Sequence, residues 1–550
     1  MRMCVPNFSI LVLHLELFAM HLSLRWGNID LREAEPYTLA TYSLVVLCVL
    51  WICASKGIRA NIPKDRYPLV FDAQWLFPLS LIYKPLNWFK NGPKIIHDAY
   101  EKYPGIIYQL PSTDRPSIVL PVEFLEEISK LPRGIASNSH AIADFFVGDW
   151  TTLDTDAFSH TTLETIRTQY IAKIGQQIGP ASDEADFVFG RYFSSYEDWT
   201  PVAPQPKIVR VVTQTIGRTI AGTEICRKPE WVDSVIGYAQ NVFAAAVYMR
   251  LVPRMLRPLV AVFTPYIYRI HSYRRRIRKL ITPIIEQRLF WRHQQPEFWA
   301  ARLKSEEMST VDWLVEYSPP EESKTAIMAH RLTGVSFGAS HTTSNHITNC
   351  LYELAADFDR WAPPLREEID TILGSSLTNI TNAHLSRMWK LDSFMKETQR
   401  FHPPAKLSVN RTFLEPYELS SGDRIPKGIH TSLAGVPMSM SEEYFPDAAT
   451  FDGFRFERLR RDNGKKYSGL QFTSSYAGSL HFGHGRQMCP GRFMGSLISK
   501  LLVIKFLQCY DMKLREKESR PENIMVFDMD YPNPDYEILF RDRKIDVSSS

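Results

Sequence analysis

A single cysteine in a glycine-rich turn constrains most strongly what this chain can fold into. The segment His481–Phe493 has the sequence HFGHGRQMCPGRF, and Cys489 stands directly before Pro490. The residues that follow, Met494–Tyr510, are apolar at helical spacing, so the cysteine is predicted to lie at the start of a helix. Glycine lets the backbone approach a flat group closely, and proline is tolerated at a helix start because it lacks an N–H group.

A cysteine at the start of a helix is suited to bind a metal ion. The helix dipole and the free N–H groups of the first turn stabilise a thiolate, so we expect them to lower the pKa of the thiol. Such a thiolate is a good ligand for haem iron. The alternative for a lone cysteine is a small buried residue in a glycine-rich turn, but the ordered surroundings of Cys489 favour the ligand.

The spacing of this turn resembles the haem-ligand signature of the cytochrome P450 family, and the ending CPGRF resembles the form found in filamentous fungi. The resemblance implies that Cys489 binds the iron of haem b as its thiolate ligand. The family commonly has arginine or histidine two residues before the cysteine, where it meets a haem propionate. Here that position is Gln487, beside Arg486, so either side chain is a candidate for this contact. The turn residues implied to bind haem are Phe482, Gly485, Arg486, Cys489 and Gly491.

A second motif lies about 90 residues before the cysteine. Phe394–Pro404 has the sequence FMKETQRFHPP, which places Glu397 and Arg400 on one face of a helix that ends at the proline pair. The alternative is an exposed ion pair, which contributes only about 0.2–0.5 kcal/mol. The position resembles the ExxR helix of the same family, which implies a buried structural network of Glu397, Arg400 and Arg455 that holds the cysteine turn. The resemblance also implies that Arg411 is a partner for a haem propionate.

A third motif lies in the run Leu332–Ala355, which is predicted to form a long helix and contains the sequence FGASHTT. Its threonines can either turn inward or donate to carbonyls of their own helix. The run resembles the oxygen-binding helix of the family, which implies that Thr342 is the catalytic threonine. The acid that the family has beside this threonine is replaced by His341. A histidine exchanges protons near neutrality, so His341 is either a second catalytic residue or a packed helix residue.

The amino-terminal residues 1–59 are predicted to be a membrane anchor region. The segment 37–54 carries no charge and is about long enough to cross a bilayer as a helix. More Lys and Arg residues follow this segment than closely precede it, which predicts that the rest of the chain lies in the cytosol. The segment 8–24 is also apolar but contains Glu16, so it spans the bilayer, lies at its surface or is a poor signal peptide.

The charge balance argues against a nucleic-acid partner. The chain has 64 Lys and Arg residues against 60 Asp and Glu residues, a net charge of +4, and such a balance is not that of an electrostatic nucleic-acid binder. The seven cysteines show no paired spacing of the zinc or thioredoxin type. We therefore expect no disulfide framework and a reducing compartment.

The sequence after residue 60 contains no long linker, charge block or repeat, so 60–550 is predicted to be one catalytic domain. The resemblance implies the cytochrome P450 fold, which is mainly α with small β-sheets. It implies an oxidoreductase of the endoplasmic reticulum membrane that inserts one oxygen atom from O2 into a lipophilic small molecule. Electrons would come from NADPH through a separate reductase, because the chain has neither a flavin nor a nicotinamide fingerprint.

Two other functions use the same residues differently. A haem-thiolate isomerase or dehydratase would keep Cys489 but would need no O2, and the two threonines at 342 and 343 argue against it. A membrane protein that binds haem or lipid without turnover is the second alternative. The fungal form of the cysteine turn suggests, by analogy alone, a terpenoid, alkaloid or polyketide substrate in secondary-metabolite biosynthesis.

Overall fold

The structure is a computed structural model of the 550-residue chain and describes residues 67–70, 80–111, 117–305, 307–374, 380–462, 468–516 and 518–544. These residues belong to one compact unit, Ala60–Ser550. The predicted anchor region 1–59, with its segments 8–24 and 37–54, lies outside the described residues. No single described helix is long and apolar enough to cross a membrane, although the bent pair Pro229–Leu251 and Arg254–Phe263 meets the requirement by length and composition.

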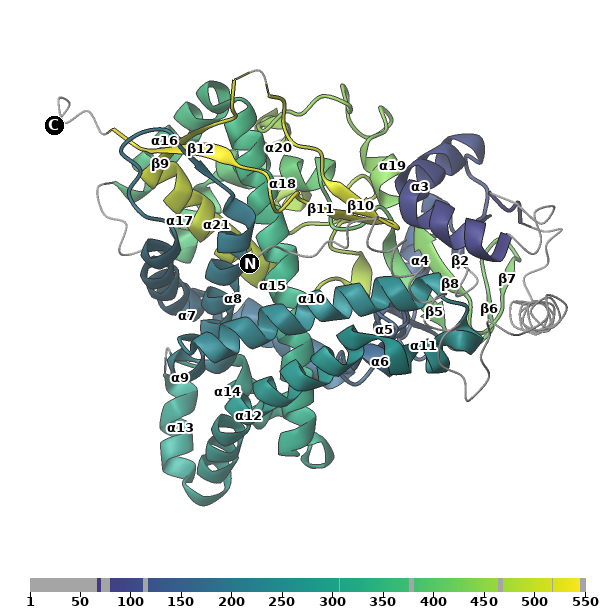
Figure 1. The fold of residues 1–550 in the computed structure, drawn as a ribbon, viewed down its shortest axis with the longest axis horizontal. Helices are drawn as coiled ribbons and strands as arrows, with labels where there is room; N and C mark the ends of the chain where they lie inside the picture. The colour runs from purple at the N-terminus through teal and green to yellow at the C-terminus, as the bar shows by residue number, and fades with distance from the viewer. Residues whose placement is uncertain are drawn as a thin grey trace, which may run out of the picture. The chain divides into compact units, whose positions relative to one another are not determined.

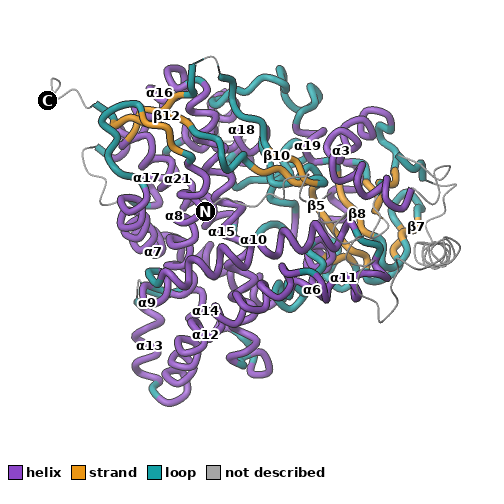
Figure 2. The backbone as a smooth tube through the Cα atoms, viewed as in Figure 1, coloured by secondary structure: helices purple, strands orange, loops and turns teal. Residues whose placement is uncertain are grey.

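Helices make up most of the described chain (Figures 1 and 2). The longer helices are α3 (Ser80–Lys102), α7 (His160–Tyr192), α8 (Pro204–Ala221), α10 (Pro229–Leu251), α12 (Pro265–Gln294), α15 (Thr325–Ala356), α16 (Phe358–Leu373), α18 (Trp389–Phe401) and α21 (Arg492–Cys509). The shorter helices are α4 (Leu125–Lys130), α5 (Asn138–Phe145), α6 (Gly148–Thr151), α9 (Thr223–Cys226), α11 (Arg257–Phe263), α13 (Pro296–Lys304), α14 (Thr310–Tyr317), α17 (Asn382–Arg387), α19 (Gly435–Ser439) and α20 (Arg455–Asp462).

The strands form small sheets, as the predicted fold class requires. The largest sheet has the order β1-β2-β8-β5-β3, in which only the β2–β8 pair is parallel. Its strands are β1 (Tyr108–Leu110), β2 (Ser117–Val119), β3 (Ala136–Ser137), β5 (Ser408–Phe413) and β8 (His430–Leu433). A second sheet contains β4 (Thr200–Val202), β12 (Ile538–Asp542) and β9 (Tyr510–Lys513), and two hairpins pair β10 (Ile524–Val526) with β11 (Met529–Tyr531) and β6 (Tyr417–Glu418) with β7 (Arg424–Ile425).

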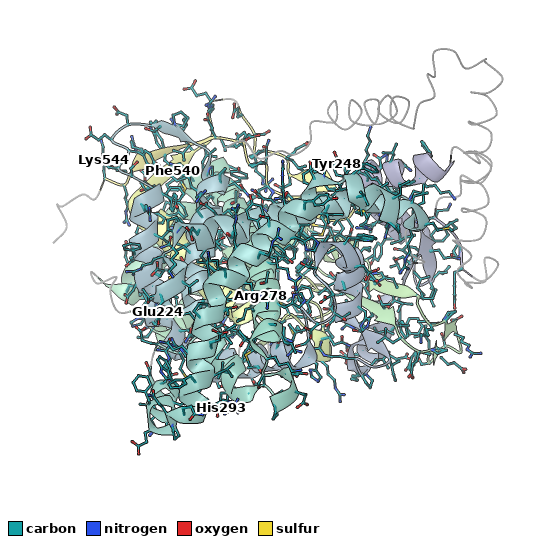
Figure 3. All side chains as sticks on the ribbon, turned by 60° about the horizontal axis from the view of Figure 1, so that its bottom comes forward. Glu224, Tyr248, Arg278, His293, Phe540 and Lys544 are labelled. Carbon is teal, nitrogen blue, oxygen red and sulfur yellow. The ribbon has the colours of Figure 1, made fainter. Side chains whose placement is uncertain are left out.

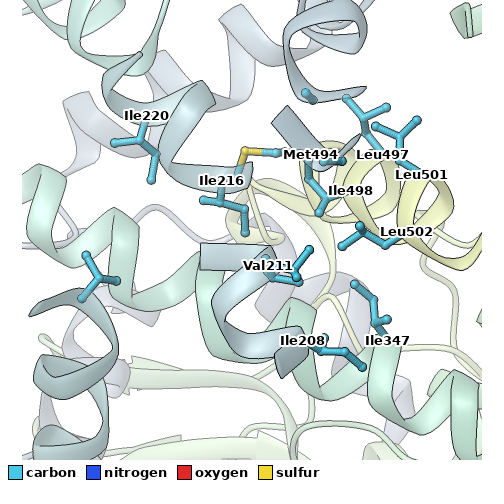
Figure 4. Close-up of a cluster of buried hydrophobic side chains, with 14 of the residues drawn as sticks. Ile208, Val211, Ile216, Ile220, Ile347, Met494, Leu497, Ile498, Leu501 and Leu502 are labelled. Carbon is cyan, nitrogen blue, oxygen red and sulfur yellow. The ribbon is translucent and has the colours of Figure 1, made fainter. Parts of the chain in front are cut away.

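Helix α15 forms the centre of the main core, where it packs against α8, α12, α18 and α21. Figure 4 shows the meeting point of α8, α15 and α21. Each aliphatic side chain buried there stabilises the fold by about 1.5–3 kcal/mol. The labelled members are Ile208, Val211, Ile216, Ile220, Ile347, Met494, Leu497, Ile498, Leu501 and Leu502. This core fixes the position of α21, and therefore of the cysteine turn that precedes it.

The three predicted helices are present with slightly different bounds. The run 332–355 lies within the longer α15, and the ExxR helix is α18, which ends at Phe401 before the proline pair. The run 494–510 follows α21 to its end at Cys509, and its last residue, Tyr510, begins β9. The basic run 269–279 lies on α12, where Ile270 and Ile277 are buried and Arg278 is exposed (Figure 3). The basic side chains of this run therefore lie mainly on the solvated face of the helix.

Candidate functional site

The cysteine turn folds back on itself before α21 begins. The backbone N–H of Cys489 donates to the carbonyl oxygen of Phe482 at 2.8 Å. Gly491 is the N-cap residue of α21, so Pro490 lies just outside the helix rather than in its first turn. The glycines at 483 and 485 have φ angles of 74° and 67°, a left-handed conformation that favours glycine.

Gly485 has a second reason to be glycine. A Cβ atom at this position would lie 2.6 Å from the Cβ of Ser129 and 2.7 Å from its carbonyl oxygen. Ser129 belongs to α4, and the backbone of the turn therefore packs directly on that helix. Only glycine combines this close approach with a positive φ angle. The turn that carries the cysteine is thus fixed by α21 on one side and by α4 on the other.

Cys489 lies deep in the protein, and burial raises the pKa of its thiol. The backbone N–H groups of Gly491 and Arg492 and the charge of Arg492 act in the opposite direction but do not outweigh burial. The expectation of a lowered thiol pKa is therefore wrong for the chain by itself, because desolvation is the larger effect. The side chain is nevertheless exposed, so it faces an open space inside the fold.

Helix α15 also has a short exposed strip on its surface. Gly338 and Thr342, one turn apart, are exposed on a helix that is otherwise largely buried. The hydroxyl of Thr342 donates to the carbonyl oxygen of Gly338 at 2.9 Å. A Cβ atom at Gly338 would have no neighbour within 4 Å. The bond within the helix is the one expected for a helical threonine, and it leaves the lone pairs of the hydroxyl free to accept.

His341 lies on a different side of α15. Its ring is buried and lies 6.0 Å from the ring of Phe243 on α10, measured between centroids. Burial lowers the pKa of His341 to about 4, so the ring is neutral near pH 7. Its Nε2 atom has no hydrogen-bond partner in the part of the chain that the structure describes. The structure does not bring His341 into contact with the hydroxyl of Thr342, and the expected proton exchange near neutrality is not supported.

An aromatic row connects the cysteine turn with α15. The ring of Phe482 contacts the edge of Phe472, with centroids 5.3 Å apart. Phe472 in turn stacks on His346, one helical turn after Thr342, at 4.8 Å. Pairs of this geometry are favourable beyond the area that they bury. These aromatic contacts hold the cysteine turn at a fixed separation from α15, the helix that the resemblance identifies as the oxygen-binding helix.

Glu397, Arg400 and Arg455 form one buried network. Arg400 donates from Nε and from a terminal nitrogen to the two oxygens of Glu397, both at 2.8 Å. Arg455 donates from Nε to Glu397 Oε1 at 3.1 Å. The side chain of Glu397 is completely buried, so the exposed ion pair that the spacing also allowed is ruled out. A bidentate arginine–carboxylate pair is among the strongest hydrogen-bonded arrangements in proteins.

The two arginines of this network also hold the long segment before α20. A terminal nitrogen of Arg400 donates to the carbonyl oxygens of Ser439 and Ala448, at 2.9 and 2.8 Å. Arg455 donates to the carbonyl oxygen of Thr450 at 2.9 Å. Buried carbonyl groups require such partners. The network therefore stabilises the end of α19 and the irregular backbone between α19 and α20.

Arg411 on β5 is a buried cation with unused donors. Only 1% of the residue is exposed, and one terminal nitrogen donates to the carbonyl oxygen of Asn410 at 2.9 Å. The Nε atom and the other terminal nitrogen have no partner among the described residues. Burial and the charge of Arg133 lower the pKa of Arg411 to about 10. Arg133 belongs to no sequence motif and becomes relevant only through its position beside Arg411.

Gln487 and Arg486, the two candidates in the cysteine turn for contact with a haem propionate, lie in different environments. Gln487 is buried, donates to the carbonyl oxygen of Ala136 at 2.7 Å and accepts from the N–H of Asn138 at 2.9 Å. Its amide thus joins the cysteine turn to the start of α5. Arg486 is exposed. Two arginines, Arg411 and Arg486, are implied to bind haem. Of these, Arg411 is buried and has nitrogen atoms without a hydrogen-bond partner among the described residues.

These features fit a haem group. An exposed thiol, an open strip of helix at Gly338 and Thr342, and an uncompensated buried cation at Arg411 are what a flat iron-bearing ring with carboxylate substituents requires. Phe482, Gly485 and Gly491 shape the turn around the thiol. Arg133, which lies beside Arg411, is half-buried and pairs with Glu164 at 3.8 Å, whereas Arg411 has no ion-pair partner among the described residues.

A largely apolar pocket lies beside this region. Its lining includes Phe146 from the end of α5, and the Phe146 ring lies 5.0 Å from the ring of Phe337 on α15, between centroids. The turn between β10 and β11 contributes Asp528 and Met529. Figure 1 shows this hairpin beside α3. The pocket is therefore bordered by elements far apart in the sequence, and its lining residue Phe146 contacts α15.

The turn of that hairpin has an unusual backbone. Phe527, which precedes the two lining residues, has a φ angle of 58°, in the left-handed region. Its N–H donates to the carbonyl oxygen of Phe89 on α3 at 3.1 Å. A Cβ atom at Gly92 of α3 would lie only 2.1 Å from the carbonyl oxygen of Phe527. Main-chain contacts with α3 thus maintain the strained turn.

Comparison with known proteins places these features in one family. A family model described as Cytochrome P450 matches residues 159–540. The chain is 32% identical over 458 residues to cytochrome P450 monooxygenase penP of Penicillium crustosum, which covers 82% of this chain and 86% of that protein. It is 30% identical over 511 residues to cytochrome P450 monooxygenase AtmP of Aspergillus flavus, covering 92% and 94% of the two chains. The fold is similar to that of the retinoic acid-bound cyanobacterial CYP120A1, with a TM-score of 0.63, 14% identity and coverage of 84% and 96%.

Proposed function

Because the chain belongs to the cytochrome P450 family and is a monooxygenase, we propose that it oxidises a lipophilic intermediate of fungal secondary metabolism, a terpenoid, alkaloid or polyketide. The reaction inserts one oxygen atom from O2 into the substrate. The apolar pocket beside α15 supports a lipophilic substrate. The similarity to monooxygenases of Penicillium and Aspergillus supports the fungal assignment.

Haem b would be held from two sides by residues already described. Cys489 would bind the iron as thiolate, and Arg411, with Arg133 beside it, would meet the propionates. The bound haem supplies the activation of O2, and its thiolate ligand favours cleavage of the O–O bond. Electrons would come from NADPH through a separate reductase, as the family implies.

Thr342 would deliver protons on the O2 side of the site. Its Oγ1 atom lies in an open place, where its lone pairs can accept a hydrogen bond from water and so hold the water that supplies the proton, while its own proton is bonded to the Gly338 carbonyl. His341 would pack against Phe243 and take no part in proton transfer, because burial keeps its ring neutral. The open strip at Gly338 and Thr342 is the observation that carries this assignment.

We expect Thr342→Ala to retain haem and substrate binding but to lose proton delivery. Product formed per NADPH consumed should fall at least about tenfold, since positioned proton transfer contributes roughly 10²–10⁴-fold to rates. The lost NADPH should appear as peroxide. The measurement uses purified holoenzyme reconstituted with a reductase and records product, peroxide and NADPH together.

His341→Phe is the matched control, because it preserves an aromatic ring beside Phe243 and removes the titratable group. Coupling should be unchanged in this variant. Unchanged coupling in Thr342→Ala would contradict the proposed mechanism and favour an isomerase or dehydratase that needs no O2. Loss of coupling in His341→Phe would return the histidine to the proton relay.

We also propose that the protein is bound to the endoplasmic reticulum membrane by segment 37–54, with the catalytic domain in the cytosol. An exposed apolar patch on the catalytic unit supports membrane contact. It consists of Met255, Leu259, Val262 and Phe263, which are 54–65% exposed and lie on or just before α11. Clustered large apolar side chains on a surface are typical of interaction with a partner or a lipid surface.

Deleting residues 1–56 should release only part of the protein from the membrane fraction, because the α11 patch remains. Adding Leu259→Ser and Phe263→Ser to this deletion should release most of the rest, since each change removes exposed apolar area from the lipid surface. The measurement is the distribution between sedimented membranes and supernatant. Complete release by the deletion alone would exclude a role for the patch, and protection of the full-length domain from added protease would reverse the topology.

A further inference from the structure

One hydrogen-bond donor in the pocket has no partner. Trp88 lies on α3, is only 4% exposed and lines the pocket. Its indole Nε1 atom is buried without a hydrogen-bond partner in the described chain. Buried indole N–H groups normally find an acceptor, because an unsatisfied donor in a nonpolar place is unfavourable. Trp88 therefore brings an unsatisfied donor to the wall of the pocket.

The ring of Trp88 is held in place by a small core of its own. That core includes Ile96 and Ala99 from α3 and Leu407 from the segment before β5. Val247 and Leu251 from the end of α10 pack against it. A tryptophan packed on several sides cannot turn its N–H away to find water at low cost. The direction of the donor is therefore built into the fold.

Two charged side chains line the same pocket, and their signs are opposite. Arg250 at the end of α10 lies between the rings of Phe145 and Phe527, with its guanidinium carbon 4.4 and 4.3 Å from their centroids. Asp528 supplies the negative charge. A carboxylate substrate would be attracted by Arg250 but repelled by Asp528, so the lining offers no net charge for an ionised ligand. A neutral ligand has no such conflict.

We propose that Trp88 is a specificity-determining residue that donates a hydrogen bond from Nε1 to a neutral oxygen atom of the substrate, as in a ketone, ester, ether or alcohol. This inference rests on the proposed function, because it names the substrate class of the same pocket. The remaining lining is mainly apolar, and Phe146 connects it with Phe337 on α15. The oxygen of the substrate would thus be held near α3 and its hydrocarbon part would extend toward α15.

Two probes that differ in one carbonyl group, 4-phenylcyclohexanone and phenylcyclohexane, test this hydrogen bond. Calorimetry on the haem-loaded protein should show about 5- to 10-fold tighter binding of the ketone, the ratio expected for one net hydrogen bond. Trp88→Phe keeps an aromatic ring and removes the N–H. It should abolish this preference while the affinity for the hydrocarbon stays within about twofold. Trp199→Phe, outside the pocket, should leave both affinities unchanged.

Three outcomes would overturn the inference. The first is an unchanged ketone preference in folded Trp88→Phe protein. The second is tighter binding of 4-phenylcyclohexanecarboxylate than of the ketone, which would assign the site to an anion at Arg250. The third outcome is measured on the wild-type protein, so it remains available if Trp88→Phe fails to fold. It is a carbonyl stretching frequency of the bound, labelled ketone that equals its value in an apolar solvent. The reduced, carbon monoxide-treated spectrum of the same preparation tests the proposed function separately, because calorimetric binding does not depend on turnover.

Discussion

Cys489→Ala is expected to abolish the thiolate-type Soret band of the reduced, carbon monoxide-treated protein and to reduce product formation to background. The variant removes the sulfur atom that would bind iron, and no other side chain of the cysteine turn offers a thiolate. Because the cysteine side chain faces an open space, its loss leaves the packing of α21 intact. The measurements are the reduced spectrum, haem content and turnover with NADPH and reductase.

Cys509→Ala is the matched control for this experiment. Cys509 is another exposed cysteine of the described chain and is the last residue of α21, the helix that follows the cysteine turn. Its replacement should leave the spectrum and turnover unchanged. If Cys489→Ala retained both, the thiolate ligand would have to be assigned elsewhere, whatever the similarity of the turn to the family signature.

Arg400→Ala is expected to give little folded, haem-loaded protein. Removing one partner of a buried ion pair costs about 3–5 kcal/mol, a large part of the roughly 5–15 kcal/mol that stabilises a domain. The change also leaves the carbonyl oxygens of Ser439 and Ala448 without their donor. The measurements are the yield of soluble protein, haem content per chain and the thermal unfolding midpoint.

Lys130→Ala controls for the loss of an ordinary surface ion pair. Lys130 lies 3.2 Å from Glu126 with both side chains exposed, and its removal should cost less than about 1 kcal/mol. Arg411→Met separates folding from haem retention, because it removes a buried charge that lacks a partner for two of its nitrogens. This variant should fold but retain less haem. Normal yield and haem content in Arg400→Ala would contradict the structural role of the network.

The parts of the site that the sequence predicted are those set by local spacing. Glu397 and Arg400 are three residues apart on one helix, so their contact follows from helix geometry. The cysteine turn is likewise defined by neighbouring glycines and the helix that follows. Arg455 is 58 residues from Glu397, and only the resemblance to a family brought it into the network. The mainly helical fold was inferred from that resemblance as well.

The features that were not predicted depend on burial and long-range packing. Trp88 and Arg133 belong to no motif, and the roles proposed for them follow from surroundings contributed by distant segments. His341 shows this most clearly, because the sequence allows both a catalytic and a packed role for it. Its ordinary pKa suggested proton exchange near neutrality, whereas burial lowers the pKa to about 4. A sequence gives the intrinsic pKa of a side chain, but desolvation is a property of the packed structure.

The left-handed turn at Phe527 has a consequence for how enzymes of this design diversify. The shape of the turn is maintained by main-chain contacts with Phe89 and Gly92, and the two residues that follow it, Asp528 and Met529, project their side chains into the pocket lining. The backbone scaffold and the chemical identity of the lining are thus encoded at different positions. After gene duplication, mutations at 528 and 529 can alter which molecule is accepted while selection on Gly92 preserves the turn, so new substrate preferences can arise with little loss of foldability.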